Sequence, residues 1–310
     1  MAQTLLAICQ QASREMGISA PATIISNTDL YAVQLLNLFN GLGQDLAQEY
    51  DWQGLTREHS FSTEFYQYTG DSTSGSTSLT NMSSIASLDT TLMIEGTGVP
   101  TDTFISDATG TTVVMSREAT ATDTTETYTF SKVQYALPTG FARLIDRTEW
   151  DKTQSWPMPG PMSAQGWQSI KGFGIASAGP PSFFRIIRNL FQIYPPLGSE
   201  NFLRYEYVSQ FWGATSASAT PTLSTVTADT DTNIYPDRLM VEGLKLRFRM
   251  ARNDSSMKSY RPEDIASGFP MRLLNIAKAN DAGSPDLTMI PRRTSILLGE
   301  DNFPEGDLGA

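Results

Sequence analysis

The helical signals of this sequence fall at its two ends, and that placement restricts the possible folds more than any other feature. Apolar residues recur at intervals of three and four in two segments within 1–56 and in two more within 233–283. Two helices alone bury too little apolar surface to form a stable core. The sequence therefore predicts a single helical bundle that combines both ends of the chain. The alternative is two separate helical hairpins, one at each end.

The residues between the two helical ends show the alternating pattern of β-strands. Thr and Ser are frequent from residue 57 to 132, and Gly and Pro separate short alternating runs. Almost only Ala, Ser, Thr, Pro and Asp occupy 214–232, which indicates a linker loop. The predicted fold class is α+β, an antiparallel β-rich region inserted into a helical bundle. Three further segments are predicted: a β-rich middle domain over 57–70 and 131–213, a small inserted β-module over 71–130, and an extended C-terminal arm over 284–310.

One predicted helix, which begins at Pro236, is apolar around most of its circumference and should be the central one. Arg247 falls in the middle of its apolar side. A buried Arg without a partner costs several kcal/mol. We therefore predict a buried or interface ion pair between Arg247 and a carboxylate of the second helix, either Asp45 or Glu49.

Composition limits the classes of partner. The formal net charge of -11 is opposite to what nucleic-acid binding requires, although a local basic patch is compatible with it. The single cysteine, Cys9, allows no intrachain disulfide, which is typical of assembly in a reducing cytoplasm. No targeting signal is recognisable, and no apolar run approaches the roughly 20 residues that span a bilayer. The sequence reads as a soluble protein that does not contact a membrane.

Motifs for catalysis, metals and cofactors are poorly represented. His59 is the only histidine, and no nucleophile elbow accompanies it. Asp229, Asp231 and Asp237 lack the glycine and terminal glutamate of a calcium loop, so we interpret them as a solvated acidic loop. Gly96-Thr97-Gly98 lacks the third glycine of a dinucleotide loop. We expect no catalytic residues, no metal and no cofactor.

Three tryptophans, Trp150, Trp156 and Trp167, lie close together in sequence among prolines. Such residues fill a core or a subunit contact more often than they bind ligands. A shared aromatic surface would instead indicate glycan binding. Paired carboxylates that cleave a glycosidic bond cannot be recognised from sequence spacing alone.

The overall plan resembles that of a phage protein family. Its elements are the N-terminal helices with Leu35, Asn37, Leu46, Glu49 and Trp52, the stretch from Ala136-Leu137-Pro138 to Arg143-Leu144, the strands Ile193-Tyr194-Pro195 and Arg204-Tyr205-Glu206-Tyr207, and Tyr235-Pro236-Asp237 before the last helices. Together they look like the head-to-tail adaptor (tail tubular A-like) proteins of short-tailed bacteriophages. In addition, residues 94–100, 111–116 and 119–122 are similar to a small β-module found in phage virion proteins.

The resemblance implies a structural protein and not an enzyme. Such adaptors form a ring, usually of twelve subunits, in the virion neck after assembly in the host cytoplasm. The ring contacts the portal protein and the tail nozzle or tube, and DNA only passes through its lumen. The alternatives are a receptor- or glycan-binding tail protein and a cell-wall hydrolase.

The C-terminal arm carries apolar residues that have no local segment to pack against, and such segments order on binding a partner. Arg292 and Arg293 could pair with acids of that partner. The alternative is a tail without a partner. The residues expected to make the contact are Ile290, Arg292, Arg293, Ile296, Leu297, Leu298 and Phe303.

Overall fold

The protein has a mixed α/β fold in which strand residues outnumber helical residues over the part of the chain that is described. The computed structural model describes residues 3–172, 182–218, 220–252 and 269–281. These residues divide into two compact units. We call them the helical unit, with the described residues within 1–54, 213–219 and 225–310, and the β unit, with residues 55–212 and 220–224.

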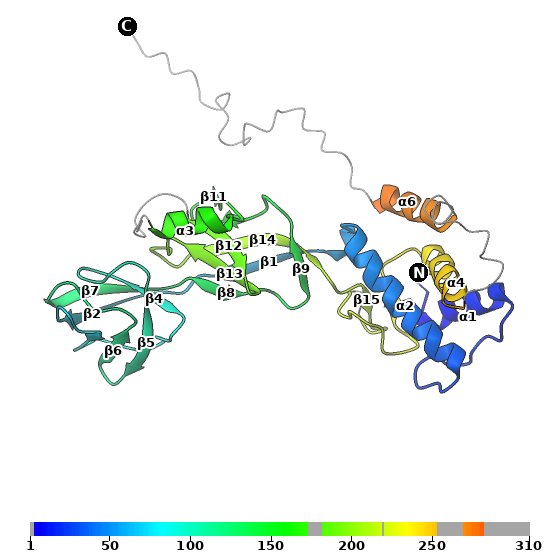
Figure 1. Cartoon of the computed structure of the whole chain (residues 1–310), viewed down its shortest axis with the longest axis horizontal. Coiled ribbons are helices and arrows are strands. Elements are labelled where there is room, and N and C mark those ends of the chain that lie inside the picture. The colour runs from blue at the N-terminus through cyan, green and yellow to red at the C-terminus, as the bar shows by residue number, and fades with distance from the viewer. Residues whose placement is uncertain (1–2, 173–181, 219, 253–268, 282–310) are drawn as a thin grey trace, which may run out of the picture. The chain divides into compact units, whose positions relative to one another are not determined.

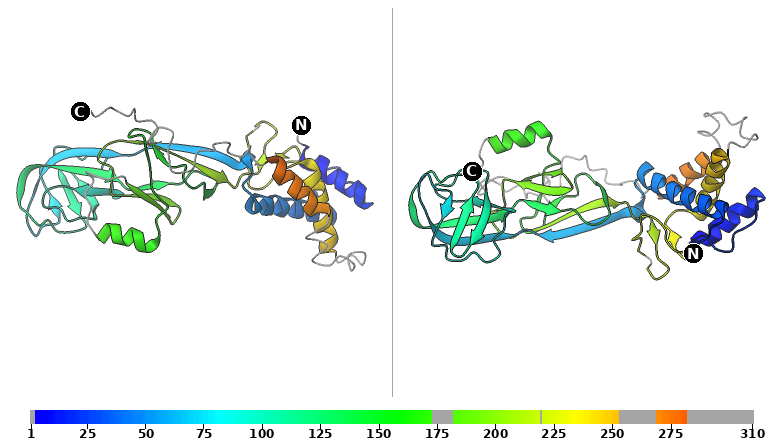
Figure 2. Two further views of the ribbon diagram at one scale, coloured as in Figure 1. Left: turned by 90° about the horizontal axis from the view of Figure 1, so that it is seen from above. Right: turned by 60° about the horizontal axis from the view of Figure 1, so that its bottom comes forward.

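The helical unit takes its helices from both ends of the chain, and α4 contacts each of the other three (Figures 1 and 2). A two-stranded sheet accompanies them. The elements are α1 (Leu5–Met16), α2 (Leu30–Glu49), α4 (Asp237–Ala251), α6 (Phe269–Asp281), β15 (Gly213–Ala214) and β16 (Thr232–Asn233).

Local sequence explains where these helices begin and end. The Thr4 hydroxyl accepts a hydrogen bond from the Ala7 N–H at 3.3 Å, and the Asp29 carboxylate accepts one from Tyr31 at 3.3 Å. Each side chain caps the first turn of its helix. Gly17 ends α1 with a positive φ of 73°, a conformation that glycine adopts without steric cost.

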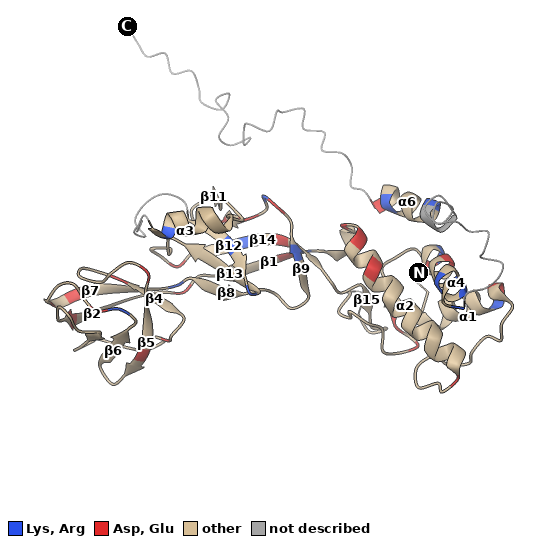
Figure 3. Cartoon of the chain, in the orientation of Figure 1, with Lys and Arg blue, Asp and Glu red and all other residues tan. Residues whose placement is uncertain are grey.

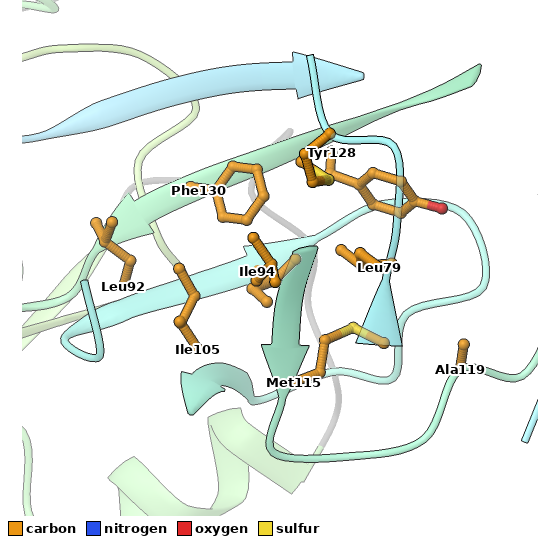
Figure 4. Close-up of a cluster of buried hydrophobic side chains, with 10 residues drawn as sticks. Leu79, Leu92, Ile94, Ile105, Met115, Ala119, Tyr128 and Phe130 are labelled. Atoms are coloured by element: carbon orange, nitrogen blue, oxygen red, sulfur yellow. The ribbon is translucent and has the colours of Figure 1, made fainter. Parts of the chain in front are cut away.

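The first part of the β unit is a six-stranded antiparallel sheet in the order β2-β7-β4-β5-β6-β3. Its apolar side chains form a core that includes Ile94, Tyr128 and Phe130, all fully buried (Figure 4). The paired strands β2 and β7 extend beyond the module predicted over 71–130. The strands are β2 (Phe65–Ser72), β3 (Ser78–Leu79), β4 (Leu92–Glu95), β5 (Thr103–Thr109), β6 (Thr112–Met115) and β7 (Asp123–Lys132).

The rest of the β unit contains two further antiparallel sheets, of five and three strands. Three nearly parallel rings join them, because Phe191 stacks on Phe184 at 4.9 Å and on Tyr205 at 5.2 Å. After the short 3-10 helix Gln53–Leu55, the larger sheet comprises β1 (Thr56–Ser62), β9 (Phe141–Leu144), β10 (Trp150–Asp151), β11 (Trp156–Pro157) and β14 (Phe202–Ser209). The smaller one comprises β8 (Gln134–Ala136), β12 (Phe183–Ile187) and β13 (Leu190–Tyr194).

A short helix, α3 (Ala164–Gly172), packs on the β unit through Trp167, which is 2% exposed. Trp167 shares a cluster with Met93 of β4 and Tyr194 of β13. Lys171 forms an ion pair of 3.0 Å with Asp102, beside β5. The helix therefore links the six-stranded sheet to the three-stranded sheet within this unit.

The predicted linker over 214–232 is in fact packed. Val226 and Asp231 are each 3% exposed, and the Val226 N–H donates to the Asn40 side chain of α2 at 2.9 Å. Residues 220–224 belong to the β unit, where the Trp212 indole donates to the Ser224 carbonyl at 2.8 Å. A composition typical of linkers did not reveal these contacts, because the partners are distant in sequence.

Candidate interaction surface of the helical unit

The core of the helical unit is the close approach of α2 and α4. A Cβ atom added at Gly243 would lie only 2.8 Å from the Leu42 side chain, so glycine allows the two helices to come together. The Tyr235 hydroxyl, which precedes α4, donates to the Gly43 carbonyl at 3.0 Å. Because these contacts fix α2 against α4, the other faces of the two helices point toward solvent.

Arg247 lies where it donates to the Asp45 carboxylate, one of the two carboxylates predicted for it. The other, Glu49, accepts from Lys278 of α6 at 2.9 Å. The Arg247 and Asp45 side chains are 28% and 64% exposed, so the pair is not buried within one copy, and its place in a subunit interface stays a prediction. An exposed pair of this kind contributes about 0–1 kcal/mol.

The interpretation of Asp229 and Asp231 as a solvated loop was wrong. One Asp229 oxygen accepts from the N–H groups of Ile24 and Ile25, at 3.0 and 2.8 Å. Asp231 is buried and binds two N–H groups of its own loop. Asp237 accepts from the Gln3 N–H at 2.9 Å. The Asp229 and Asp237 carboxylates therefore tie this part of the chain to the segments before α2 and α1, and the Asp231 carboxylate closes its own loop.

His59 lies on β1, beside the aromatic rings of Phe61 at 5.6 Å and Tyr205 at 5.3 Å. Partial burial lowers the pKa of its imidazole. Within the described ranges, no group of three or more His, Cys, Asp and Glu side chains is placed to hold a metal ion. Both of these contacts of His59 are with aromatic rings, and neither supplies an acid or a nucleophile.

The three tryptophans do not share a surface. Trp167 is buried, whereas Trp156 is 57% exposed. Trp150 pairs with Pro157, and Trp156 pairs with Asp151. Successive residues of a strand point to opposite faces, so Trp150 and Trp156 lie on opposite faces of the sheet. A glycan platform built from the three residues is excluded.

Three exposed apolar residues of the helical unit gather at the start of α2. Leu30 is 73% exposed, and Tyr31 and Val33 are each 40% exposed. Arg252, at the end of α4, covers the Tyr31 ring at 4.3 Å, and Met250 is 50% exposed nearby in sequence. We call Leu30, Tyr31, Val33 and Arg252 the α2 start patch.

The patch continues into a helix face to which α2 itself contributes no charge, although the Arg247 guanidinium of α4 lies beside Gly41 there. From Leu30 to Gln44, the first fifteen residues of α2 contain no Asp, Glu, Lys or Arg. Acidic residues occur only toward the end of the helix (Figure 3). Asn37 and Gln44 are exposed in this stretch. The sequence analysis missed this surface, although the long uncharged run could have revealed it.

The residues predicted to contact a partner through the C-terminal arm lie outside the described part of the chain. They are Ile290, Arg292, Arg293, Ile296, Leu297, Leu298 and Phe303. Among the described helices, none is long and apolar enough to span a bilayer.

Comparison with known proteins adds no identification. A scan against models of protein families finds no match to this chain, and a search of curated proteins finds none either.

Proposed function

We propose that this protein is the head-to-tail adaptor of a short-tailed bacteriophage. Twelve copies form a ring in the virion neck, between the portal protein and the tail nozzle or tube, with a lumen for DNA. The helices from both chain ends form the bundle that packs from subunit to subunit, and the six-stranded β-module is an insertion.

The observation that carries the proposal is the exposed face of α2 to which the first fifteen residues of the helix contribute no charge. A monomeric protein normally covers an exposed helix with charged residues, whereas the centre of a subunit interface is depleted of them. Asn37 and Gln44 are polar but uncharged, so they lose less free energy of hydration on burial than ions would. We infer that this face contacts a second copy of the chain.

Other features agree with this role. The acidic balance of the whole chain, -11, disfavours stable binding of the phosphate backbone, as a channel for DNA requires. The residues that resemble the phage β-module fall on β4 and β6 and on the segments beside them. The separation of Trp150, Trp156 and Trp167 removes the aromatic surface on which the glycan-binding alternative rested.

The test is electron microscopy and mass photometry of the purified full chain over a range of concentrations. We expect closed rings with a central pore, and twelve copies of a 34.0 kDa chain give a particle of about 400 kDa. The variant Asn37→Lys, which places a charge in this face of α2, should shift the population toward monomers. The matched control Thr111→Lys, at an exposed turn of the β-module, should leave the rings intact.

A trimer, or a chain that stays monomeric at the highest concentrations, would contradict the adaptor proposal. Degradation of peptidoglycan that a single Asp or Glu substitution abolishes would favour the hydrolase alternative.

A further inference from the structure

The α2 start patch combines apolar and cationic character. Leu30, Tyr31 and Val33 supply exposed apolar surface, and Arg252 holds its guanidinium over the Tyr31 ring. Arg249, one turn earlier on α4, is exposed as well. Two acids lie close by in sequence, Asp29, whose carboxylate caps the first turn of α2, and Asp254. A complementary ligand would be apolar and acidic.

The same chain contains a segment of that chemistry. Residues 299–310 include Glu300, Asp301, Glu305 and Asp307, with no Lys or Arg among them. Phe303 stands in the middle of these acids. The segment is therefore opposite in charge to the patch and carries an aromatic anchor.

The helical unit places the origin of this segment far from the patch on the same copy. α6 ends at Asp281, whose carboxylate accepts from the Gln53 N–H at 2.7 Å, beyond the far end of α2. A helix of 20 residues is about 30 Å long. The chain from Asp281 to Phe303 can reach about 70 Å when extended, enough for the patch of its own copy or of a neighbouring copy, and only the neighbouring copy gives the contact that the proposed ring needs.

We propose that residues 299–310 of one copy dock on the α2 start patch of the next copy. This inference rests on the proposed function, because it supplies the contact from subunit to subunit. Asp281, from which the segment starts, and the α2 start patch lie at opposite ends of α2, so each copy gives one contact and receives one. Head-to-tail contacts of this kind form rings when the rotation between copies closes.

Chemical crosslinking of the full chain tests the proposal. One tagged copy carries Val33→Cys, a differently tagged copy carries Asn302→Cys, which keeps Phe303, and the mixture is treated with a short bismaleimide. Cys9 does not interfere, because it is fully buried and burial raises the pKa of its thiol to about 12. The control replaces Val33→Cys with Gln48→Cys, at an exposed position near the other end of α2.

We expect a crosslink between the two tagged copies with Val33→Cys and little with Gln48→Cys. Leu30→Asp should lower the yield about fivefold, because it sets like charge against the acidic segment. This position is exposed and in the first helical turn, where an acid favours the helix, so the fold should remain intact.

Each remaining outcome overturns the inference in a distinguishable way. Rings that form without the crosslink remove this contact but leave the adaptor proposal standing. A crosslink found only when both cysteines are on one chain shows that the segment folds back on its own copy. Absence of rings together with absence of the crosslink contradicts both proposals.

Discussion

Asp231 is the buried carboxylate whose removal tests the architecture of the helical unit most directly. It is 3% exposed, and one of its oxygens accepts from the N–H groups of Thr227 and Ala228, both at 2.8 Å. Its carbonyl accepts from the Leu5 N–H at 2.8 Å, at the start of α1. The side chain therefore fixes the loop on which the first helix begins.

The substitution Asp231→Ala leaves these two N–H groups without their acceptor. A hydrogen bond to a charged group contributes about 1.5–3 kcal/mol, and a shared acceptor makes the two less than additive. We expect the free energy of unfolding to fall by about 2–4 kcal/mol. The control Asp231→Asn keeps an oxygen in the same place and loses only the charge, so it should cost about 1 kcal/mol.

Urea unfolding followed by circular dichroism at 222 nm measures this effect, because four of the five described helices lie in the helical unit. The two units can unfold separately, so a signal from helices is needed. The midpoint for Asp231→Ala should fall by about 1–2 M urea. The reasoning is refuted if Asp231→Ala unfolds with the wild type, or if Asp231→Asn costs as much as Asp231→Ala.

Two further predictions concern buried polar groups. Burial raises the pKa of Glu149 to about 7. Between about pH 4.5 and 7, the folded state therefore keeps the proton on Glu149, whereas the unfolded state has lost it. The free energy of unfolding of the wild type should therefore fall as pH rises through this window. Glu149→Gln should raise the free energy of unfolding by about 1–3 kcal/mol at pH 8 and by almost nothing at pH 4. Equal effects at the two pH values would contradict this prediction. Tyr235→Phe removes the hydrogen bond to Gly43 but keeps the ring beside Trp52, at a centroid distance of 5.3 Å. The free energy of unfolding in urea should fall by about 1 kcal/mol. A fall of more than about 3 kcal/mol would show that the ring itself has moved.

The candidate surface could have been read from the sequence only in part. The uncharged run from Leu30 to Gln44 is visible there, but exposure is not. An apolar residue at a helix start is as often buried as exposed, and only the contacts of α4 and Arg252 show which side of α2 faces solvent. The pairing of Arg247 with Asp45 followed from charge, whereas its position at the surface did not.

What the sequence by itself determined is the set of local elements. Gly17 ends α1 with a positive φ, and Arg188-Asn189, both with positive φ, form the turn between β12 and β13. Such features depend on residues a few positions apart. Tertiary structure decided the roles of Asp229, Asp231 and the tryptophans. Asp229 binds N–H groups 204 and 205 residues away, and strand register assigned Trp150 and Trp156 to opposite faces. Contacts between residues so far apart in sequence depend on how distant segments pack, and the spacing of residues along the chain does not predict that packing.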